Sequence, residues 1–497
     1  MEHQRSHQLD RAQLDPLSSP VLQRELPGLA AALDEQIMRE RLQTTFFGAD
    51  SRFVIERCNP GQAIYLAGVF CGLRYEMEVR DTASGQMIEP LVIGRVFQDQ
   101  SACARFFHDQ LEPVAALSRD REELAPFVTP IALFESLNMA AHVFPIDGEL
   151  PALLDVTDRR RVIEILRETL PEVQEGRFMP HACRVELAHY GRQHRCTLRY
   201  LLDGAASDGA NAHQVVYGKV TADGSGERTI PVLAALRERL PALNGMDRVN
   251  IPRVLGFHPD LQLLLLEAIP GKPQVARLLK ARLAGAEATQ PGMLTLEHAV
   301  GDCGRIAARM HTSGIALGQP RTIDAELDWL RQSIHALRRI SPEPGAQLQD
   351  WLEWISACAA RTDPLPLCFS HGDFTYTQLI FDDRQCGLVD FDTICQAEPA
   401  LDLGQFLAYQ RLAIRKDQRP DAPFPEAATE QLCEQFLNAY EAASGERWGD
   451  KQRLRERVAV YEILMLLRLA VHSWQKLKIS RLEHAMKLLE ERIACLQ

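Results

Sequence analysis

The chain has no apolar segment long enough to cross a bilayer. Its longest apolar helical stretch runs only from Val458 to Val471 and carries Glu462 and Arg468. A spanning helix needs about 20 largely apolar residues. The N-terminal sequence MEHQRSHQLDRAQ also has no apolar core of a secretion signal. We therefore expect a cytoplasmic protein with no membrane partner.

Paired cysteine motifs are also missing. The 12 cysteines include no C-x-x-C pair and no zinc-finger spacing, which predicts free thiols in a reducing compartment. The net charge of −12 argues against nucleic acid as a partner, because an acidic chain repels a phosphate backbone. No Walker A loop and no G-x-G-x-x-G occurs either.

What the sequence does contain is a change from strands to helices. Residues 177–271 alternate polar and apolar side chains and predict strands around one helix, whereas residues after 271 show helical spacing to the end of the chain. The 497 residues suggest two to four units, and 46% hydrophobic content allows a sizeable core. Strands followed by helices predict a two-lobed α+β fold.

A second copy of the strand-rich unit precedes residue 177. The segment Leu91–Phe97 resembles Val215–Thr221, and Thr129–Gly148 resembles Ile251–Gly271. The separation between the two segments is nearly the same in both copies, from Gly94 to Pro130 in the first and from Gly218 to Pro252 in the second. Such self-similarity predicts a duplicated structural unit, although chance similarity between β-rich stretches is the alternative.

The segment SHGDFTYTQLIFDDRQCGLVDFDTICQAEPALDLG carries the strongest chemical pattern. Asp373 lies in a tight His-Gly-Asp turn, Gln378 precedes an apolar strand, and Asp390 follows the next strand. Convergent carboxylate and amide oxygens suit Mg²⁺, which also binds substrate phosphates. Phosphoryl transfer needs metal on the phosphates and a carboxylate beside the acceptor hydroxyl. We expect Asp373 to be catalytic and Gln378 and Asp390 to hold the metal; a simple turn is the alternative.

This segment resembles the aminoglycoside phosphotransferase and choline-kinase-like family of small-molecule kinases, relatives of the protein kinases. The family pattern is H-G-D-x-x-x-x-N with a second Asp further along the chain, and the spacing from Asp373 to Asp390 matches it. Asp402 in PALDLG matches a family Asp that supports the loop. Gln378 departs from the family Asn, and its side chain is one methylene longer.

The resemblance implies a protein-kinase-like fold: an antiparallel-sheet N-lobe and a mainly helical C-lobe, preceded here by the degenerate duplicated unit. The expected division is an N-terminal helical segment (1–50), a degenerate N-lobe-like domain (51–150), the N-lobe (151–271) and the C-lobe (272–497). Arg95 occupies the position of Lys219 in the first copy, so that copy is expected to lack nucleotide chemistry, since Arg does not replace Lys at a phosphate site.

The resemblance also implies a nucleotide site. Lys219 is expected to bind ATP, with Glu227 preferred over Glu238 as its partner. Leu266, Glu267, Ala268 and Ile269 are expected to form the hinge against adenine, and the turn Gly191-Arg192-Gln193 to cover the phosphates. His311, at a predicted helix end, is interpreted as a packing residue.

These expectations together predict a Mg²⁺- and ATP-dependent kinase of a small hydroxylated molecule: an aminoglycoside, an amino alcohol or a sugar-like metabolite. The alternative is a pseudokinase-like nucleotide-binding or scaffolding protein, favoured by Gln378 and the extra domain. A protein kinase is disfavoured because no glycine-rich loop is visible. The sequence identifies neither the acceptor nor a protein partner of the N-terminal domain.

Overall fold

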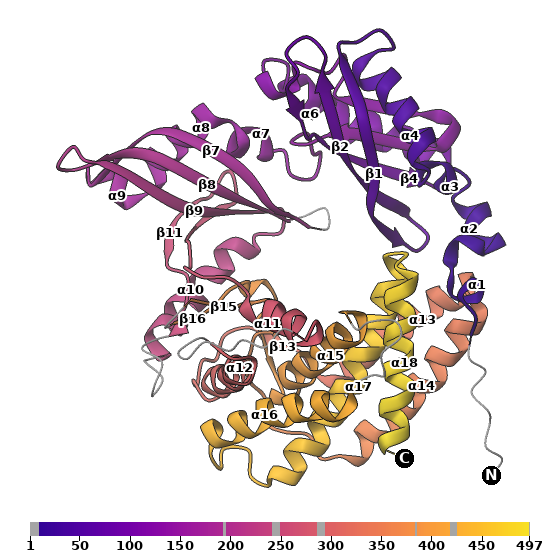
Figure 1. The fold of residues 1–497 in the computed structure, drawn as a ribbon, viewed down its shortest axis with the longest axis vertical. Helices are drawn as coiled ribbons and strands as arrows, with labels where there is room; N and C mark the ends of the chain where they lie inside the picture. The colour runs from indigo at the N-terminus through magenta and orange to yellow at the C-terminus, as the bar shows by residue number, and fades with distance from the viewer. Residues whose placement is uncertain are drawn as a thin grey trace.

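The computed structural model describes residues 9–191, 195–240, 249–285, 294–382, 385–417 and 425–496. Two strand-rich units stand above a large helical lobe, and the first described helix, α1 (Arg11–Leu14), lies beside that lobe (Figure 1). The predicted fold class, α+β with a sheet-based N-lobe and a helical C-lobe behind an additional N-terminal unit, is confirmed. Within the described ranges, none of the helices combines the length and apolarity that a bilayer crossing needs. All 12 cysteines are free.

The first sheet has the strand order β1-β2-β4-β6-β5, with the short β3 paired to β2. Its strands are β1 (Phe53–Leu66), β2 (Phe70–Asp81), β3 (Met87–Ile88), β4 (Leu91–Phe97), β5 (Ile131–Phe134) and β6 (Met139–Val143). The second sheet has the order β7-β8-β9-β12-β11. Its strands are β7 (Phe178–Tyr190), β8 (Arg195–Ala206), β9 (Asn211–Thr221), β11 (Val254–His258) and β12 (Leu263–Glu267). Apart from β3, each sheet has five strands. The third strand in chain order lies at the centre of the sheet, and the fifth strand lies between the third and the fourth.

The two central strands carry their cations at the same register. Arg95 on β4 lies opposite Ala140 of the fifth strand, and Lys219 on β9 lies opposite Leu264 of the fifth strand. The shared strand order and this shared register support the duplication that the sequence predicts. The domain boundaries at residues 50, 150 and 271 stay predictions.

A glycine precedes the cation in each copy for the same reason. A Cβ at Gly94 would lie 3.2 Å from the ring of Tyr75, and a Cβ at Gly218 would lie 2.6 Å from the ring of Tyr200. Both tyrosines come from the second strand of their sheet, and both donate their hydroxyl to a backbone carbonyl. In both units the glycine, which has no side chain, therefore leaves room for a buried tyrosine ring.

Arg95 is held by charge and ring contacts within the first unit. Its guanidinium forms a two-bond ion pair with Glu149, at 2.7 and 3.1 Å, and lies over the rings of Phe70 and Phe106. The side chain is only 6% exposed. A bidentate, stacked arginine of this kind holds structure together, and the absence of nucleotide chemistry in this copy stays a prediction.

Helix α10 (Ser225–Arg239) connects the central strand of the second sheet to its outer strands. It begins at Ser225, so Pro231 lies in its second turn. The start at Ser225 follows from Gly224, whose φ of 68° is readily adopted only by glycine, and from Asp223, whose carboxylate accepts the Ser225 N–H at 3.0 Å.

Within the described residues, the helical lobe contains eight long helices and two small sheets. The helices are α11 (Gln274–Leu283), α12 (Leu296–His311), α13 (Ile323–Ile340), α14 (Pro342–Arg361), α15 (Pro399–Asp417), α16 (Glu426–Ser444), α17 (Lys451–Gln475) and α18 (Ile479–Leu496). One sheet joins β10 (Val249–Asn250), β16 (Cys386–Leu388) and β15 (Leu379–Phe381); the other joins β13 (Gln319–Pro320), β17 (Cys395–Ala397) and β14 (Cys368–Ser370). These two sheets hold the segment that the sequence marks as catalytic.

Shorter helices fill the connections. Those before the first sheet are α1 (Arg11–Leu14), α2 (Pro20–Glu25), α3 (Leu29–Ala32) and α4 (Glu35–Leu42). Those within and after it are α5 (Gln100–Phe106), α6 (Glu112–Leu117), α7 (Leu153–Thr157), α8 (Arg159–Thr169) and α9 (Pro171–Gln174). The first group ties the start of the chain to the helical lobe, because Ser19 donates to the carbonyl of Ile340 at 2.6 Å and Glu25 pairs with Arg339 at 2.7 Å.

A buried ion pair anchors the catalytic segment to helix α17. The guanidinium of Arg457 donates two hydrogen bonds of 2.6 Å to Glu398, the residue just before α15, and both side chains are at most 4% exposed. Glu398 also accepts from the hydroxyl of Tyr461 and from the backbone N–H of Leu365. The start of α15 is therefore fixed by a fully satisfied charged cluster.

Replacing Arg457 with Met is expected to lower the free energy of unfolding by about 3–5 kcal/mol, because Glu398 is left as an uncompensated buried charge. Urea denaturation measures it. Lys451→Met, which removes an exposed cation from the same helix, should change stability by less than about 1 kcal/mol. The double variant Glu398→Gln/Arg457→Met should recover part of the loss. A loss from Arg457→Met no larger than the control's would contradict the account.

Candidate active site

A cavity of about 790 Å³ lies between the second sheet and the helical lobe. From the sheet side it is lined by Lys219 and by the segment after β12. From the lobe side it is lined by Asp373 and by the residues that follow β16. Its apolar wall comes from both sides and consists of Tyr217, Leu233, Pro252, Leu266, Ile269, Ile380, Val389 and Phe391. A cavity of this size, apolar with a few convergent charges, is typical of a small-molecule site.

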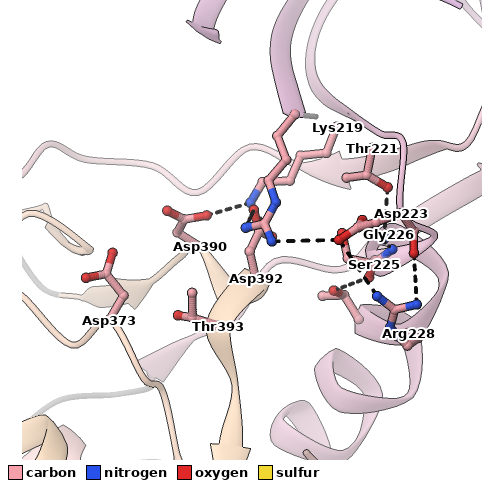
Figure 2. Close-up of polar contacts among 12 residues, drawn as sticks. Lys219, Thr221, Asp223, Ser225, Gly226, Arg228, Asp373, Asp390, Asp392 and Thr393 are labelled. Atoms are coloured by element: carbon pink, nitrogen blue, oxygen red, sulfur yellow. Dashed lines mark hydrogen bonds and ion pairs between the residues drawn. The ribbon is translucent and has the colours of Figure 1, made fainter. Parts of the chain in front are cut away.

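Lys219 reaches across the cavity to two aspartates of the lobe. Its Nζ lies 2.7 Å from Asp390 Oδ1 and 2.9 Å from Asp392 Oδ1 (Figure 2). Burial lowers the pKa of Lys219, but the two carboxylates outweigh burial and hold the pKa above its ordinary value. Burial likewise raises the pKa of Asp390, and Lys219 more than offsets this, so its pKa lies below the usual range. The pair is therefore ionised at neutral pH.

Arg195 is a second cation at this position, and sequence reasoning missed it. It begins β8, lines the same cavity, and lies 3.6 Å from Asp392 and 4.0 Å from Asp223. Side-chain alternation along the strand could have indicated it. Thr197 pairs with Lys219 across the sheet, and Arg195, two residues before Thr197, lies on the same face of the strand. Asp392 was also missed, although it stands two residues after Asp390.

Asp373 lies beyond Asp390 as seen from Lys219 (Figure 2). The amide of Gln405, on α15, donates to its Oδ1 at 2.5 Å, and the amide of Gln378 donates to its Oδ2 at 3.4 Å. Burial raises the pKa of Asp373 above its ordinary value, and the charge of Asp390 adds to this effect against the opposing influence of His371 and the two amides. Gln405 was not singled out in the sequence.

The turn that presents Asp373 is held by Asp402. The carboxylate of Asp402 accepts the backbone N–H of His371 at 2.7 Å and that of Gly372 at 2.9 Å. Gly372 has a φ of 76°, and a Cβ there would lie 2.1 Å from the carbonyl oxygen of Thr393. The turn therefore needs glycine, and the carboxylate satisfies its two buried donors.

His311 has a larger role than the packing residue expected from the sequence. Its Nε2 lies 3.1 Å from Asp402, and its Nδ1 lies 3.0 Å from the hydroxyl of Tyr440, with the histidine and aspartate side chains completely buried. Burial raises the pKa of Asp402, but the hydrogen bond from His311 and the nearby His371 bring it below the usual value. His311 thus orients Asp402, and Asp402 in turn holds the turn that carries Asp373.

The donor set suits a magnesium ion that is shared with a nucleotide. Asp390 and Asp392 present carboxylates to the cavity, while Gln378 donates its amide to Asp390 at 3.3 Å as well as to Asp373. Within the described residues no cluster of three or more His, Cys, Asp or Glu side chains suits a metal by itself. Mg²⁺ commonly takes only one or two carboxylates and completes its shell with water and phosphate, so the residues present fit it.

Two parts of the predicted nucleotide site differ from expectation. The predicted partner of Lys219, Glu227, is exposed on α10, and the lysine pairs with Asp390 and Asp392 instead. The reason is helical phase: Thr229 and Leu233 of the same helix line the cavity, and Glu227 is rotated about 200° from Thr229.

Three of the four predicted hinge residues, Leu266, Glu267 and Ile269, line the cavity, and Ala268 between them is not among the lining residues. The backbone N–H of Glu267 already donates to the carbonyl of Arg253 at 2.9 Å. In the predicted turn over the phosphates, Gly191 lines the cavity, whereas Arg192 and Gln193 lie outside the described residues.

One protein-family model matches the part of the chain that carries this site. The model of the phosphotransferase enzyme family matches residues 219–457, a range that includes Lys219, Asp373 and Asp390. The resemblance expected from the sequence is therefore confirmed over this range. A comparison with curated protein sequences gave no match.

Solved structures align with the chain at low identity. A choline/ethanolamine kinase family protein from Mesorhizobium loti is 15% identical, with a TM-score of 0.40 over 67% of this chain and 97% of its own. A macrolide 2′-phosphotransferase from Brachybacterium faecium is 15% identical, with a TM-score of 0.38 over 67% and 97%. A glucosamine kinase is 16% identical, with a TM-score of 0.42 over 88% of this chain and 94% of its own.

Proposed function

We propose that this chain, whose residues 219–457 match the phosphotransferase enzyme family, transfers the γ-phosphate of ATP to a hydroxyl group of a small molecule. The observation that carries the proposal is the meeting of Lys219 from the sheet with Asp390 and Asp392 from the lobe, in a cavity that Asp373 also lines. Phosphoryl transfer is catalysed mainly by positioning and by electrostatic stabilisation, and this arrangement supplies groups for both.

The nucleotide lies between the lobes in this proposal. The adenine ring packs against the apolar wall near Leu266 and Ile380, and the phosphates extend toward Lys219 and Arg195. Two cations at one end of the cavity favour the polyanionic end of the nucleotide. Asp390 and Gln378 would hold Mg²⁺, which would supply positive charge beside the phosphates.

Asp373 orients the acceptor hydroxyl in this proposal. The acceptor oxygen forms a bond to the γ-phosphorus, the bond from that phosphorus to the bridging oxygen breaks, and ADP leaves. The hydroxyl proton passes to the Asp373 carboxylate. The amides of Gln405 and Gln378 hold this carboxylate in one orientation, so that it is already ordered before the acceptor arrives.

The acceptor is a hydroxylated small molecule, and the proposed location is the cytoplasm, which 12 free thiols support. We assign no nucleotide chemistry to residues 51–150, because Arg95 is already paired with Glu149. We do not favour the non-catalytic alternative that Gln378 suggested, since the Gln378 amide contacts both Asp373 and Asp390, and Lys219 lies 2.7 Å from Asp390.

Replacing Lys219 with Met is expected to weaken ATP binding about 10- to 100-fold, because one charge-assisted bond to phosphate is worth about 1.5–3 kcal/mol. Isothermal titration with a non-hydrolysable ATP analogue and Mg²⁺ measures the change. Lys280→Met, which removes an exposed lysine from α11, is the matched control and should leave affinity unchanged. Unaltered affinity in the Lys219 variant would remove this residue from the nucleotide site.

A further inference from the structure

A second cavity, of about 540 Å³, opens on the other side of Asp373. It shares Asp373 and Thr393 with the nucleotide cavity, and its remaining walls come from the helical lobe, chiefly α15, α17 and the start of α18. An acceptor that reacts at the γ-phosphate must reach Asp373 from a side the nucleotide does not fill. This cavity is large enough for a molecule of monosaccharide size.

Basic side chains predominate among the charged groups that line the second cavity. The described lining residues include four of them, Arg321, Arg468, Lys476 and Arg481, and a single carboxylate, Asp373. Behind the wall, the carboxylate of Glu326 contacts two of these cations, and the buried carboxylate of Asp402 acts on Arg321. Among the lining residues, basic side chains thus outnumber carboxylates. This local excess contrasts with the net charge of −12 for the whole chain.

Two of the cations are held rigidly in place by the same glutamate. Arg321 lies 2.6 Å from Glu326, and Arg468 pairs with the other oxygen of that carboxylate while its guanidinium lies over the ring of Trp329. Arg321 also donates to the carbonyl of Gly372 at 2.8 Å, so it is linked to the catalytic turn. One buried carboxylate thus serves two guanidinium groups of this wall.

Arg481 adds a positive charge whose hydrogen-bond partner is neutral. It comes from the first turn of α18 and hydrogen-bonds the hydroxyl of Tyr409. The arginine is half-buried and lines both this cavity and an adjoining one that Arg11, Lys416 and Lys478 also line. A cationic acceptor such as an amino sugar would meet like charge here, and in a partly buried site that repulsion is weakly screened.

We propose that the acceptor carries an anionic group, a carboxylate or a phosphate ester, beside the hydroxyl that receives the phosphate. This inference rests on the proposed function and specifies its substrate class. An anionic acceptor must approach the γ-phosphate, which is itself negative, and Arg321, Arg468 and Arg481 offset that repulsion. Bidentate guanidinium groups are well suited to carboxylate and phosphate, so they also orient the acceptor.

The test compares acceptors that differ in charge and share a carbon skeleton. The six-carbon series is gluconate, glucose and glucosamine; the three-carbon series is glycerate, glycerol 3-phosphate, glycerol and 2-amino-1,3-propanediol. Binding is measured by calorimetry on the full chain with Mg²⁺ and a non-hydrolysable ATP analogue. We expect an anion to bind at least about tenfold more tightly than the neutral and amino members of its series. Glycerate against glycerol 3-phosphate distinguishes carboxylate from phosphate ester.

Two variants locate the binding. Arg481→Gln should weaken binding of the preferred anion by about 10- to 100-fold with unchanged nucleotide affinity, because it removes one charge-assisted contact. Lys487→Gln, which removes an exposed cation further along α18, is the matched control. It should change neither the binding of the anion nor the affinity for the nucleotide. The inference is overturned if no anion binds, if the amino or neutral member binds as tightly as the anion, or if the two variants behave alike.

Transfer assays on the same molecules separate this inference from the proposed function. An anion that binds through Arg481 and receives no phosphate from Mg·ATP would contradict the phosphotransferase function and leave the charge preference standing. Phosphate transfer to glucosamine or 2-amino-1,3-propanediol in preference to the anions would overturn the charge preference and leave the function standing.

Discussion

Replacing Asp373 with Asn is expected to lower kcat for phosphoryl transfer by about 10²- to 10⁴-fold, the usual contribution of a general base. The amide cannot accept the hydroxyl proton, yet it has the size of the carboxylate, and its one oxygen can still accept the hydrogen bond from the Gln405 amide. Affinity for the nucleotide should change little, because Lys219 and Arg195 lie on the far side of Asp390.

Steady-state kinetics with titration of the ATP analogue separate the two effects. Asp350→Asn, at an exposed position of α14, is the matched control and should be as active as the unmodified protein. Equal losses of kcat and nucleotide affinity in the Asp373 variant would show that the residue supports the nucleotide site rather than the acceptor.

Replacing Asp390 with Asn is expected to lower kcat by about 10²- to 10³-fold through loss of electrostatic stabilisation at the phosphates. Asp390 is the predicted metal ligand, so Mg²⁺ should no longer strengthen nucleotide binding in this variant. In EDTA the affinity should match or exceed that of the unmodified protein, since one negative charge near the phosphates is gone. Lys219 keeps its contact with Asp392 at 2.9 Å, which limits structural damage.

Asp392→Asn is the comparison for that prediction, because it removes the other carboxylate bound to Lys219 and leaves Asp390 in place. Its nucleotide binding should still respond to Mg²⁺. If the Asp392 variant loses the Mg²⁺ response and the Asp390 variant retains it, then Asp392 and not Asp390 is the metal ligand.

The parts of the site that are local in sequence could be predicted. The hairpin of β15 and β16 lies between Asp373 and Asp390 in the chain, so spacing alone indicates that its polar ends converge. The duplicated unit was also visible, because Leu91–Phe97 resembles Val215–Thr221, each with a Gly-cation pair, and a second similar segment follows at nearly the same separation. Asp402 could be assigned to loop support only through the family resemblance.

The parts that depend on tertiary approach could not be predicted. Arg195 and Asp392 meet although they lie in different lobes and far apart in the sequence, and nothing near either one specifies the other. Glu227 was the wrong partner for Lys219, because a two-residue difference in helical phase decides which side chain faces the cavity. The cations of the second cavity come from the segment before α13, from α17 and its end, and from α18, whereas the net charge of the chain is negative.

The central claim is that this cavity transfers phosphate from ATP to a small hydroxylated molecule. Its most direct test is ³¹P NMR of the purified protein incubated with Mg·ATP and the charge-matched acceptors. The account predicts a new phosphomonoester signal that grows together with ADP, requires an acceptor, and is lost in the Asp373→Asn variant. Bound ATP that is never converted to a phosphomonoester with any of these acceptors, or ester formation that persists unchanged in the variant, would contradict the account.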